Sequence, residues 1–292
     1  MGYRSGLVAL AGRPNVGKST LANALSGKHV AAVSPRAQTT RRRVTAVVHG
    51  EQWQAVLLDL PGFQRPGDGL TARMQSTVNV ALEDVDGALL VLNCQEAIGG
   101  GDRFIAERLS AARTPTIVVV NKVDTRKSDQ IARFIEEAAG LIDFVDLHPV
   151  SATTGDGVAE LREGLVALLP EGPAYFPDEM TTDQTEEELA AELIREAALV
   201  RVRDEIPHAL AVEVEAVEET PSGLRLVADI IVETESQKRI VVGRGGQMVR
   251  DIGASARAEL GRLWGETVHL SLLVKVRKRW RDDESLLDRL GV

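Results

Sequence analysis

The sequence is poor in several kinds of residue on which other protein classes depend. Only one of its 292 residues, Cys94, is a cysteine, so no internal disulfide can form and a reducing compartment is indicated. Aromatic residues make up 3% of the chain, and no apolar run is long enough to cross a bilayer. The five histidines never pair at the spacing of metal ligands. These absences argue against a disulfide scaffold, a membrane-spanning protein and a zinc protein.

The length favours two domains, because one hydrophobic core rarely serves 292 residues. Residues 1–170 alternate apolar strands with helix-forming segments, which predicts an α/β domain whose mostly parallel sheet is flanked by helices. Residues 171–182 are proline-rich and predict a linker. Residues 183–292 follow the order α-β-β-α-α-β and predict a smaller α+β domain. We expect a buried strand at 144–150, a helix that Pro207 ends and a polar tail after the last strand.

Charge is distributed unevenly along the chain. The net charge is −9, yet residues 237–281 contain eleven Lys and Arg against three Asp and Glu, so the rest carries −17. A basic segment attached to an acidic body can bind a polyanion locally. No signal peptide is expected, because the first strand begins close to the N-terminus, and we predict a cytoplasmic protein.

The strongest motif lies between a short apolar strand and a helix. It reads Gly12-Arg13-Pro14-Asn15-Val16-Gly17-Lys18-Ser19, followed by Thr20, and it matches the P-loop pattern G-x-x-x-x-G-K-[ST]. The backbone N–H groups of such a loop surround phosphate oxygens at the positive end of the following helix. Lys18 would reach the β- and γ-phosphates, and Ser19 would hold Mg²⁺. Asn15 leaves two interpretations open: its side-chain oxygen binds K⁺ beside the phosphates, or it only stabilises the loop.

A second motif ends an apolar strand and reads Asp59-Leu60-Pro61-Gly62, followed by Phe63. The strand end would place the Asp59 carboxylate beside the P-loop, where it can orient Mg²⁺ through a water molecule. The Gly62 N–H could then bond the γ-phosphate. The motif D-x-x-G is weak alone and becomes specific at this place in an α/β domain with a P-loop.

A third motif indicates which base is bound. Asn121-Lys122-Val123-Asp124 follows an apolar strand, and the Asp124 carboxylate can accept hydrogen bonds from guanine N1–H and N2–H₂. Adenine offers no such donor pair. The Lys122 stem would cover the base, Asn121 would connect this loop to the P-loop, and Ser151 and Ala152 would supply an N–H to the guanine oxygen. The motif therefore predicts GTP and GDP as ligands.

The smaller domain contains the pattern G-x-x-G in the run Gly243-Arg244-Gly245-Gly246. In KH domains such a loop between two helices clamps the backbone of four nucleotides of RNA. A tight helix turn is the usual alternative, but the flanking Ile and Val residues, the element order and the basic balance favour RNA. The predicted RNA-binding residues are Lys238, Gly243, Arg244, Gly245, Gly246, Arg250, Lys275, Arg277 and Lys278. The last three lie in the run Lys275–Arg281, where Trp280 is interleaved with basic residues.

Together these motifs, with Gln38-Thr39-Thr40-Arg41 after the P-loop, resemble the Era family of GTPases over nearly the whole chain. The resemblance implies a type II KH domain, an Mg²⁺ ligand at Thr40 with Thr39 as the alternative, and binding of 16S ribosomal RNA near its 3′ end. It implies a role in assembly of the small (30S) ribosomal subunit, and no DNA partner. Phe63 stands where Ras-like enzymes carry a water-orienting glutamine, so slow hydrolysis is expected. The proposed catalytic contributors are Lys18, Thr40 and Gly62.

Two rival interpretations stay open from the sequence. In the first, the chain is a membrane-associated signalling GTPase whose basic C-terminal domain meets anionic lipid at the inner face of the cell membrane. The second rival is a metabolic P-loop kinase, which the guanine motif and the lack of a small-substrate site disfavour.

Overall fold

The computed structural model describes residues 2–34, 39–63, 66–202 and 206–292, and it divides into two compact units. The first comprises Met1–Ala31, Thr40–Arg65 and Met74–Asp183, and the second comprises Ala32–Thr39, Pro66–Arg73 and Gln184–Val292. The polar, non-periodic segment 34–43 predicts a mobile loop, and its positions 35–38 lie outside the described residues.

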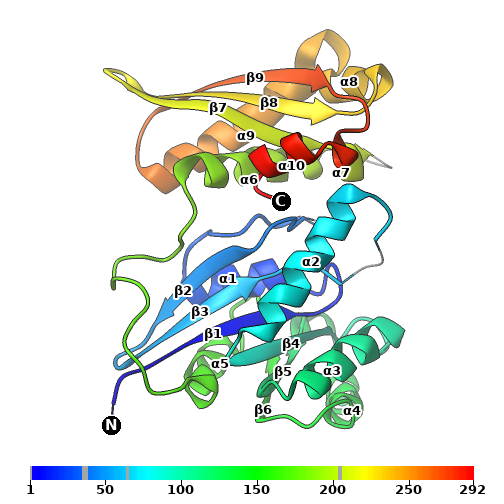
Figure 1. The fold of residues 1–292 in the computed structure, drawn as a ribbon, viewed down its shortest axis with the longest axis vertical. Helices are drawn as coiled ribbons and strands as arrows, with labels where there is room; N and C mark the ends of the chain where they lie inside the picture. Colours follow the sequence, from blue (N-terminus) through cyan, green and yellow to red (C-terminus); the bar gives the residue numbers. More distant parts are fainter. Residues whose placement is uncertain (1, 35–38, 64–65, 203–205) are drawn as a thin grey trace. The chain divides into compact units, whose positions relative to one another are not determined.

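The first unit is built on a six-stranded sheet with the order β2-β3-β1-β4-β5-β6 (Figure 1). Every neighbouring pair is parallel except β2 and β3, which form an antiparallel hairpin at one edge. The strands are β1 (Arg4–Ala11), β2 (Val44–His49), β3 (Trp53–Asp59), β4 (Gly87–Asn93), β5 (Thr116–Asn121) and β6 (Asp146–Val150). The carboxyl ends of β1, β3, β4 and β5 therefore meet along one edge, which is where parallel α/β sheets bind ligands.

Helices cover both faces of this sheet, as the alternation of apolar strands with helix-forming segments predicts. One face packs against α1 (Lys18–Ser26) and α5 (Val158–Gly164) through residues such as Leu21 and Leu161. The other packs against α2 (Gly69–Glu83), α3 (Gly100–Ala112) and α4 (Ser128–Ala139) through residues such as Val78 and Ile105. Because aromatic residues are few, Val, Leu, Ile and Ala dominate both layers of the core.

The second unit has a three-stranded sheet with the order β7-β8-β9, in which β8 and β9 are parallel (Figure 1). Its elements are α6 (Glu186–Leu199), α7 (Ile206–Ala209), β7 (Ala211–Thr220), β8 (Gly223–Val232), α8 (Glu235–Val242), α9 (Gln247–Trp264), β9 (Val268–Val276) and α10 (Glu284–Arg289). One core joins α6 and α9 to one face of the sheet. This is the α-β-β-α-α-β order of a KH domain, with two additional short helices: α7 before β7 and α10 after β9.

Three local predictions are wrong. The strand expected at 144–150 begins only at Asp146 and lies at the sheet edge, so Phe144 and Val145 are 39% and 49% exposed. Pro207 does not end a helix: α6 stops at Leu199, and Pro207 is the second residue of α7, where a missing N–H costs nothing. The supposed polar tail contains α10, whose residues Leu286 and Leu287 are buried.

Among the helices of the described residues, none is both long and apolar enough to pass through a lipid bilayer.

Candidate nucleotide and RNA sites

The P-loop is shaped by a glycine that no other residue could replace. Gly17 has φ +101°, and a Cβ there would lie 2.3 Å from Asn121 Nδ2. Asn121 Nδ2 donates to Val16 O at 2.8 Å, so the predicted connection between the third motif and the P-loop is present. The loop opens directly into α1, whose first turn has no acidic residue to compete with an anion.

Lys18 lies inside the curve of the P-loop. Its Nζ donates to the carbonyl oxygens of Gly12 and Arg13, each at 3.2 Å. Burial lowers the pKa of Lys18 because it penalises the charged form, and the negative charge of Asp59 opposes that shift. In this position the Lys18 ammonium group could donate to the oxygens of a bound phosphate in place of these two carbonyl groups.

Three side-chain oxygens from separate elements converge beside Lys18. Ser19 Oγ donates to Asp59 Oδ2 at 2.6 Å and lies 2.8 Å from Thr40 Oγ1, which in turn donates to Asp59 Oδ2 at 3.2 Å. Two hydroxyls and a fully buried carboxylate are the oxygen donors that Mg²⁺ prefers. The structure thus brings Thr40 to this group, whereas the backbone carbonyl of the alternative, Thr39, accepts a hydrogen bond from Arg195. The donor set fits the predicted metal.

The D-x-x-G segment lies against the P-loop. Leu60 is buried, and a Cβ added to Gly62 would come within 2.8 Å of Pro14. The side chain of Gln75 donates to Gly62 O at 3.2 Å. The Gly62 backbone is therefore held next to the loop that would carry the phosphates, which is the placement that its predicted role requires.

The base-recognition residues lie at the ends of β5 and β6. Asn121 Oδ1 accepts hydrogen bonds from the backbone N–H of Lys122 at 2.8 Å and of Ala152 at 3.1 Å, so the two loops are joined. Lys122 Nζ donates to Asn15 O at 2.8 Å, which lays the Lys122 stem along the P-loop. Asp124 is exposed in a single 3₁₀ turn. An exposed carboxylate beside a lysine stem can receive a purine edge from solvent.

The partners of Arg13 could not be predicted from any motif. Its Nε donates to Asp102 at 2.9 Å, and its Nη1 lies 3.0 Å from Glu96. Burial alone would lower the pKa of Arg13, but the hydrogen bond and charge of Asp102, with the charge of Glu96, raise it overall. Since Asp102 also accepts from Gly99 N at the start of α3, the P-loop and this helix are tied together.

In the second unit, the G-x-x-G loop joins α8 to the N-terminus of α9. Gly243 has φ +73°, and a Cβ there would lie 2.7 Å from Met248 Cβ, so glycine is required. Gly245 and Gly246 also have positive φ, and Arg244 is exposed. The loop therefore offers open backbone and one cation at the positive end of an 18-residue helix.

A groove of about 420 Å³ continues from this loop between α9 and β9. It is lined by Gln247, Val249, Arg250, Asp251, Gly253, Ala254, Arg257, Leu270 and Leu272. Arg257 was not predicted, although helical spacing could have found it: it lies seven residues after Arg250, on the same face as the small residues Gly253 and Ala254. The groove combines apolar walls with two exposed arginines.

The predicted basic residues do not all lie on this side of the sheet. Leu270 and Leu272 face the core, so the alternation of β9 turns Lys275 to the opposite face, while Arg277 is exposed directly after the strand ends. Lys275 forms ion pairs there with Glu215, at 2.8 Å, and with the buried Asp229. These partners raise the pKa of Lys275. The structure therefore brings Arg244, Gly246 and Arg250 together, and it separates Lys275 from them.

Trp280 corrects the interpretation of the basic run. Its side chain is fully buried, and its Nε1 donates to Ala209 O at 2.8 Å. It cannot stack on a base. Lys278 is exposed after the end of β9, and Lys238 is half-buried on α8.

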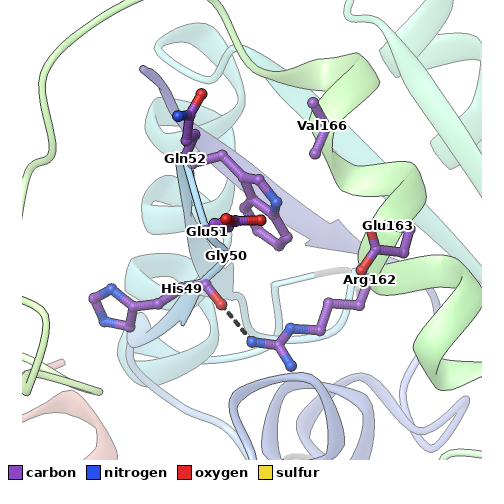
Figure 2. A pocket seen from close by; sticks show the side chains of 8 residues that line it. His49, Gly50, Glu51, Gln52, Arg162, Glu163 and Val166 are labelled. Atoms are coloured by element: carbon purple, nitrogen blue, oxygen red, sulfur yellow. Dashed lines mark hydrogen bonds between the residues drawn. The ribbon is translucent and has the colours of Figure 1, made fainter. Parts of the chain in front are cut away.

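A second cavity, of about 720 Å³, lies by the β2–β3 turn and α5 (Figure 2). Figure 2 shows Arg162 reaching from α5 to His49, where it donates to the backbone carbonyl. This turn is at the start of β3, whereas Asp59 is at its end. Among the described residues that line the cavity, none belongs to the predicted nucleotide or RNA sites.

Comparisons with known proteins cover both units. Residues 7–122 match the family model described as 50S ribosome-binding GTPase, and residues 205–281 match that of the KH domain. The chain is 45% identical over 295 residues to GTPase Era of Mycolicibacterium paratuberculosis and 40% identical over 290 residues to GTPase Era of Clostridium perfringens. These alignments cover 99% of this chain and 99% and 98% of the two relatives.

Solved structures agree with these sequence matches. A crystal structure of Era in complex with MgGDPNP and nucleotides 1506–1542 of 16S ribosomal RNA has a TM-score of 0.94 and 35% identity, with 99% of each chain covered. A structure of an Aquifex aeolicus Era variant bound to GDP·AlF₄⁻ matches with the same TM-score, identity and coverage.

Proposed function

The chain belongs to the Era family of GTPases, and we propose that it is a GTP-hydrolysing switch that binds the 3′ end of 16S ribosomal RNA and acts in 30S subunit assembly. The observation that carries the proposal is the coverage of the RNA-bound relative: its fold matches 99% of this chain, from the P-loop unit through the KH unit. The setting is the cytoplasm, where this RNA is found.

In the GTPase site, the chain's own groups stabilise charge on the phosphoryl group in transfer. Lys18 and the Gly62 N–H would contact the γ-phosphate from different sides. Ser19, Thr40 and, through water, Asp59 would hold Mg²⁺, which neutralises phosphate charge when bound. Phe63 offers no acceptor for the attacking water, so we assign no general base. This arrangement supports slow hydrolysis, as a switch requires.

In the KH unit, the RNA backbone would lie over Gly243–Gly246, with unpaired bases in the groove between α9 and β9. The open loop, the helix N-terminus and Arg244 suit phosphates, and the apolar walls of the groove suit base faces. Arg250 and Arg257 would then contact bases or phosphates inside the groove.

Co-sedimentation tests the proposed partner. With a GTP analogue and Mg²⁺ at controlled salt, the chain should pellet with 30S subunits and stay in the supernatant with 50S subunits. The measurement with 50S subunits is needed because the description of the matching GTPase family names that subunit. Pelleting with 50S subunits alone would contradict the small-subunit role.

The same assay separates the membrane rival. Lys275 lies in strand β9, and Arg277 and Lys278 follow directly after it, so none of them lies on the amphipathic helix that a membrane surface favours. Liposomes rich in anionic lipid should therefore retain little protein at about 0.15 M salt. Binding to liposomes but not to 30S subunits would favour the signalling interpretation.

Asn15 carries a prediction about monovalent ions. Its φ of +64° places it in the left-handed region that asparagine tolerates, which fits the loop-stabilising alternative. In the other alternative, the side-chain oxygen of Asn15 binds K⁺ beside the phosphates, and the ion adds positive charge where negative charge develops in the transition state. Rates of hydrolysis in KCl and in NaCl test this alternative. We expect hydrolysis to be about tenfold faster in KCl than in NaCl, and Asn15→Ala to abolish the difference. Equal rates in the two salts would remove K⁺ from the proposal.

A second prediction concerns the influence of the nucleotide on RNA affinity. By its contacts, Thr39 belongs to the second unit, as does Val33. The Thr39 carbonyl accepts a hydrogen bond from Arg195 of α6, and the Val33 N–H donates to Glu196 of the same helix at 3.1 Å. The next residue, Thr40, would join Mg²⁺ only with GTP. We expect RNA to bind more tightly with a GTP analogue than with GDP, by about 1–3 kcal/mol. Titration of the 3′-end RNA in both states measures this coupling, and equal affinities would refute it.

A further inference from the structure

The residue that follows D-x-x-G contacts a helix that none of the sequence motifs includes. The rings of Phe63 and Phe104 meet edge to face, with centroids 6.2 Å apart and planes at 76°. Aromatic pairs in this geometry attract each other beyond simple burial. Phe104 is the fifth residue of α3.

Phe104 contributes little to holding α3 on the sheet. The buried residues Ile105, Ala106 and Leu109 do that, whereas Phe104 is 50% exposed. Phe63 is half-buried at the edge of the same core. The edge-to-face contact with Phe63 is thus made by a ring that is half exposed to solvent.

Both rings have fixed positions relative to the P-loop. The start of α3 is tied to it by the pairing of Arg13 with Asp102, and the Arg13 stem lies across Gly101, where a Cβ would be 2.8 Å away. Phe63 follows Gly62, which packs on Pro14. Contacts on both sides of the aromatic pair therefore connect it to the P-loop.

The position of the Phe63 ring matters because the ring has no acceptor for a water proton. Turned toward the γ-phosphate, it would displace the attacking water without replacing the missing glutamine. We propose that Phe104 is a positioning residue for GTP hydrolysis, which holds the Phe63 ring against α3 and out of the path of that water. The inference rests on the proposed place of Gly62 beside the γ-phosphate.

Steady-state hydrolysis at saturating GTP tests the role of Phe104. Phe104→Ala should lower kcat about tenfold, since a small misplacement in the reacting geometry has effects of this order. Affinity for a fluorescent GDP analogue and the melting temperature should stay near those of the parent. Phe104→Tyr, which keeps the ring edge, should retain kcat. Phe144→Ala, another exposed phenylalanine of the same unit, is the matched control and should also retain it.

The double variant separates positioning from a general structural effect. In the Phe63→Ala background no ring remains to be held, so adding Phe104→Ala should change kcat no further. An unchanged or raised kcat in the Phe104→Ala single variant would overturn the inference. So would the same tenfold fall in the Phe63→Ala background, or an equal fall in Phe144→Ala. Each of these outcomes leaves RNA binding, and with it the proposed function, intact.

Discussion

Changing Asp124 to asparagine is expected to weaken GTP binding about 100-fold, because two hydrogen bonds to a carboxylate are replaced by a mismatched amide. The amide NH₂ would face the donors of guanine N1 and N2. Xanthine carries an acceptor where guanine has its amino group, so xanthosine triphosphate should gain affinity in the same variant. The exposed position of Asp124 means that the fold should not change.

Competition between the two nucleotides for a fluorescent analogue measures this change. Asp129→Asn is the matched control, since Asp129 is an exposed carboxylate in the first turn of α4, five residues along the chain. That control should bind GTP like the parent. If Asp124→Asn binds GTP with undiminished affinity, the base site is misassigned.

Reversing the charge of Arg244 should reduce RNA affinity about 100-fold or more at about 0.1 M salt and leave nucleotide affinity unchanged. The variant Arg244→Glu places an anion among the open backbone N–H groups of the loop, where it repels the phosphates and satisfies the donors itself. The milder Arg244→Gln should lower the slope of log affinity against log salt by about 0.7, the value for one contact to a single strand.

Arg225→Glu provides a control with the same change of charge. Arg225 is exposed on β8, on the sheet face opposite the core, where it pairs with Glu218 at 3.6 Å. Reversing its charge should weaken RNA binding only through the change in the protein's long-range electrostatic potential, by a few-fold at most at this salt. Equal losses in the two variants would show that the loop has no special place in RNA binding.

The convergence of the candidate nucleotide-site residues could be predicted from the sequence, because each motif is local in sequence. Each motif follows a strand, and the carboxyl ends of parallel strands meet at one edge, so Ser19, Asp59 and Asn121 had to converge once the strands were recognised. The resemblance already favoured Thr40 over Thr39, and the structure places Thr40 Oγ1 beside Ser19 and Asp59; sequence pattern alone left the two open, because a loop between two motifs has no periodicity that fixes its register.

The parts that could not be predicted depend on contacts between distant residues. Trp280 looked like a surface aromatic because basic residues surround it, but its indole pairs with a carbonyl 71 residues away. Which way Lys275 points is decided by the pairing of β9 with β8 and by the acidic residues that this pairing brings near. Arg13 and Asp102 are 89 residues apart, and no motif joins them.

The most direct test of the account is the affinity of the intact protein, with Mg²⁺ and a GTP analogue, for a fragment of the 3′ end of 16S ribosomal RNA. A scrambled single strand of equal length and composition serves as the competitor. The account predicts that the 3′-end fragment binds at least about tenfold more tightly, since base contacts in the groove add to the phosphate contacts that both strands share. Equal affinity for the two strands, or no binding to either, would contradict it.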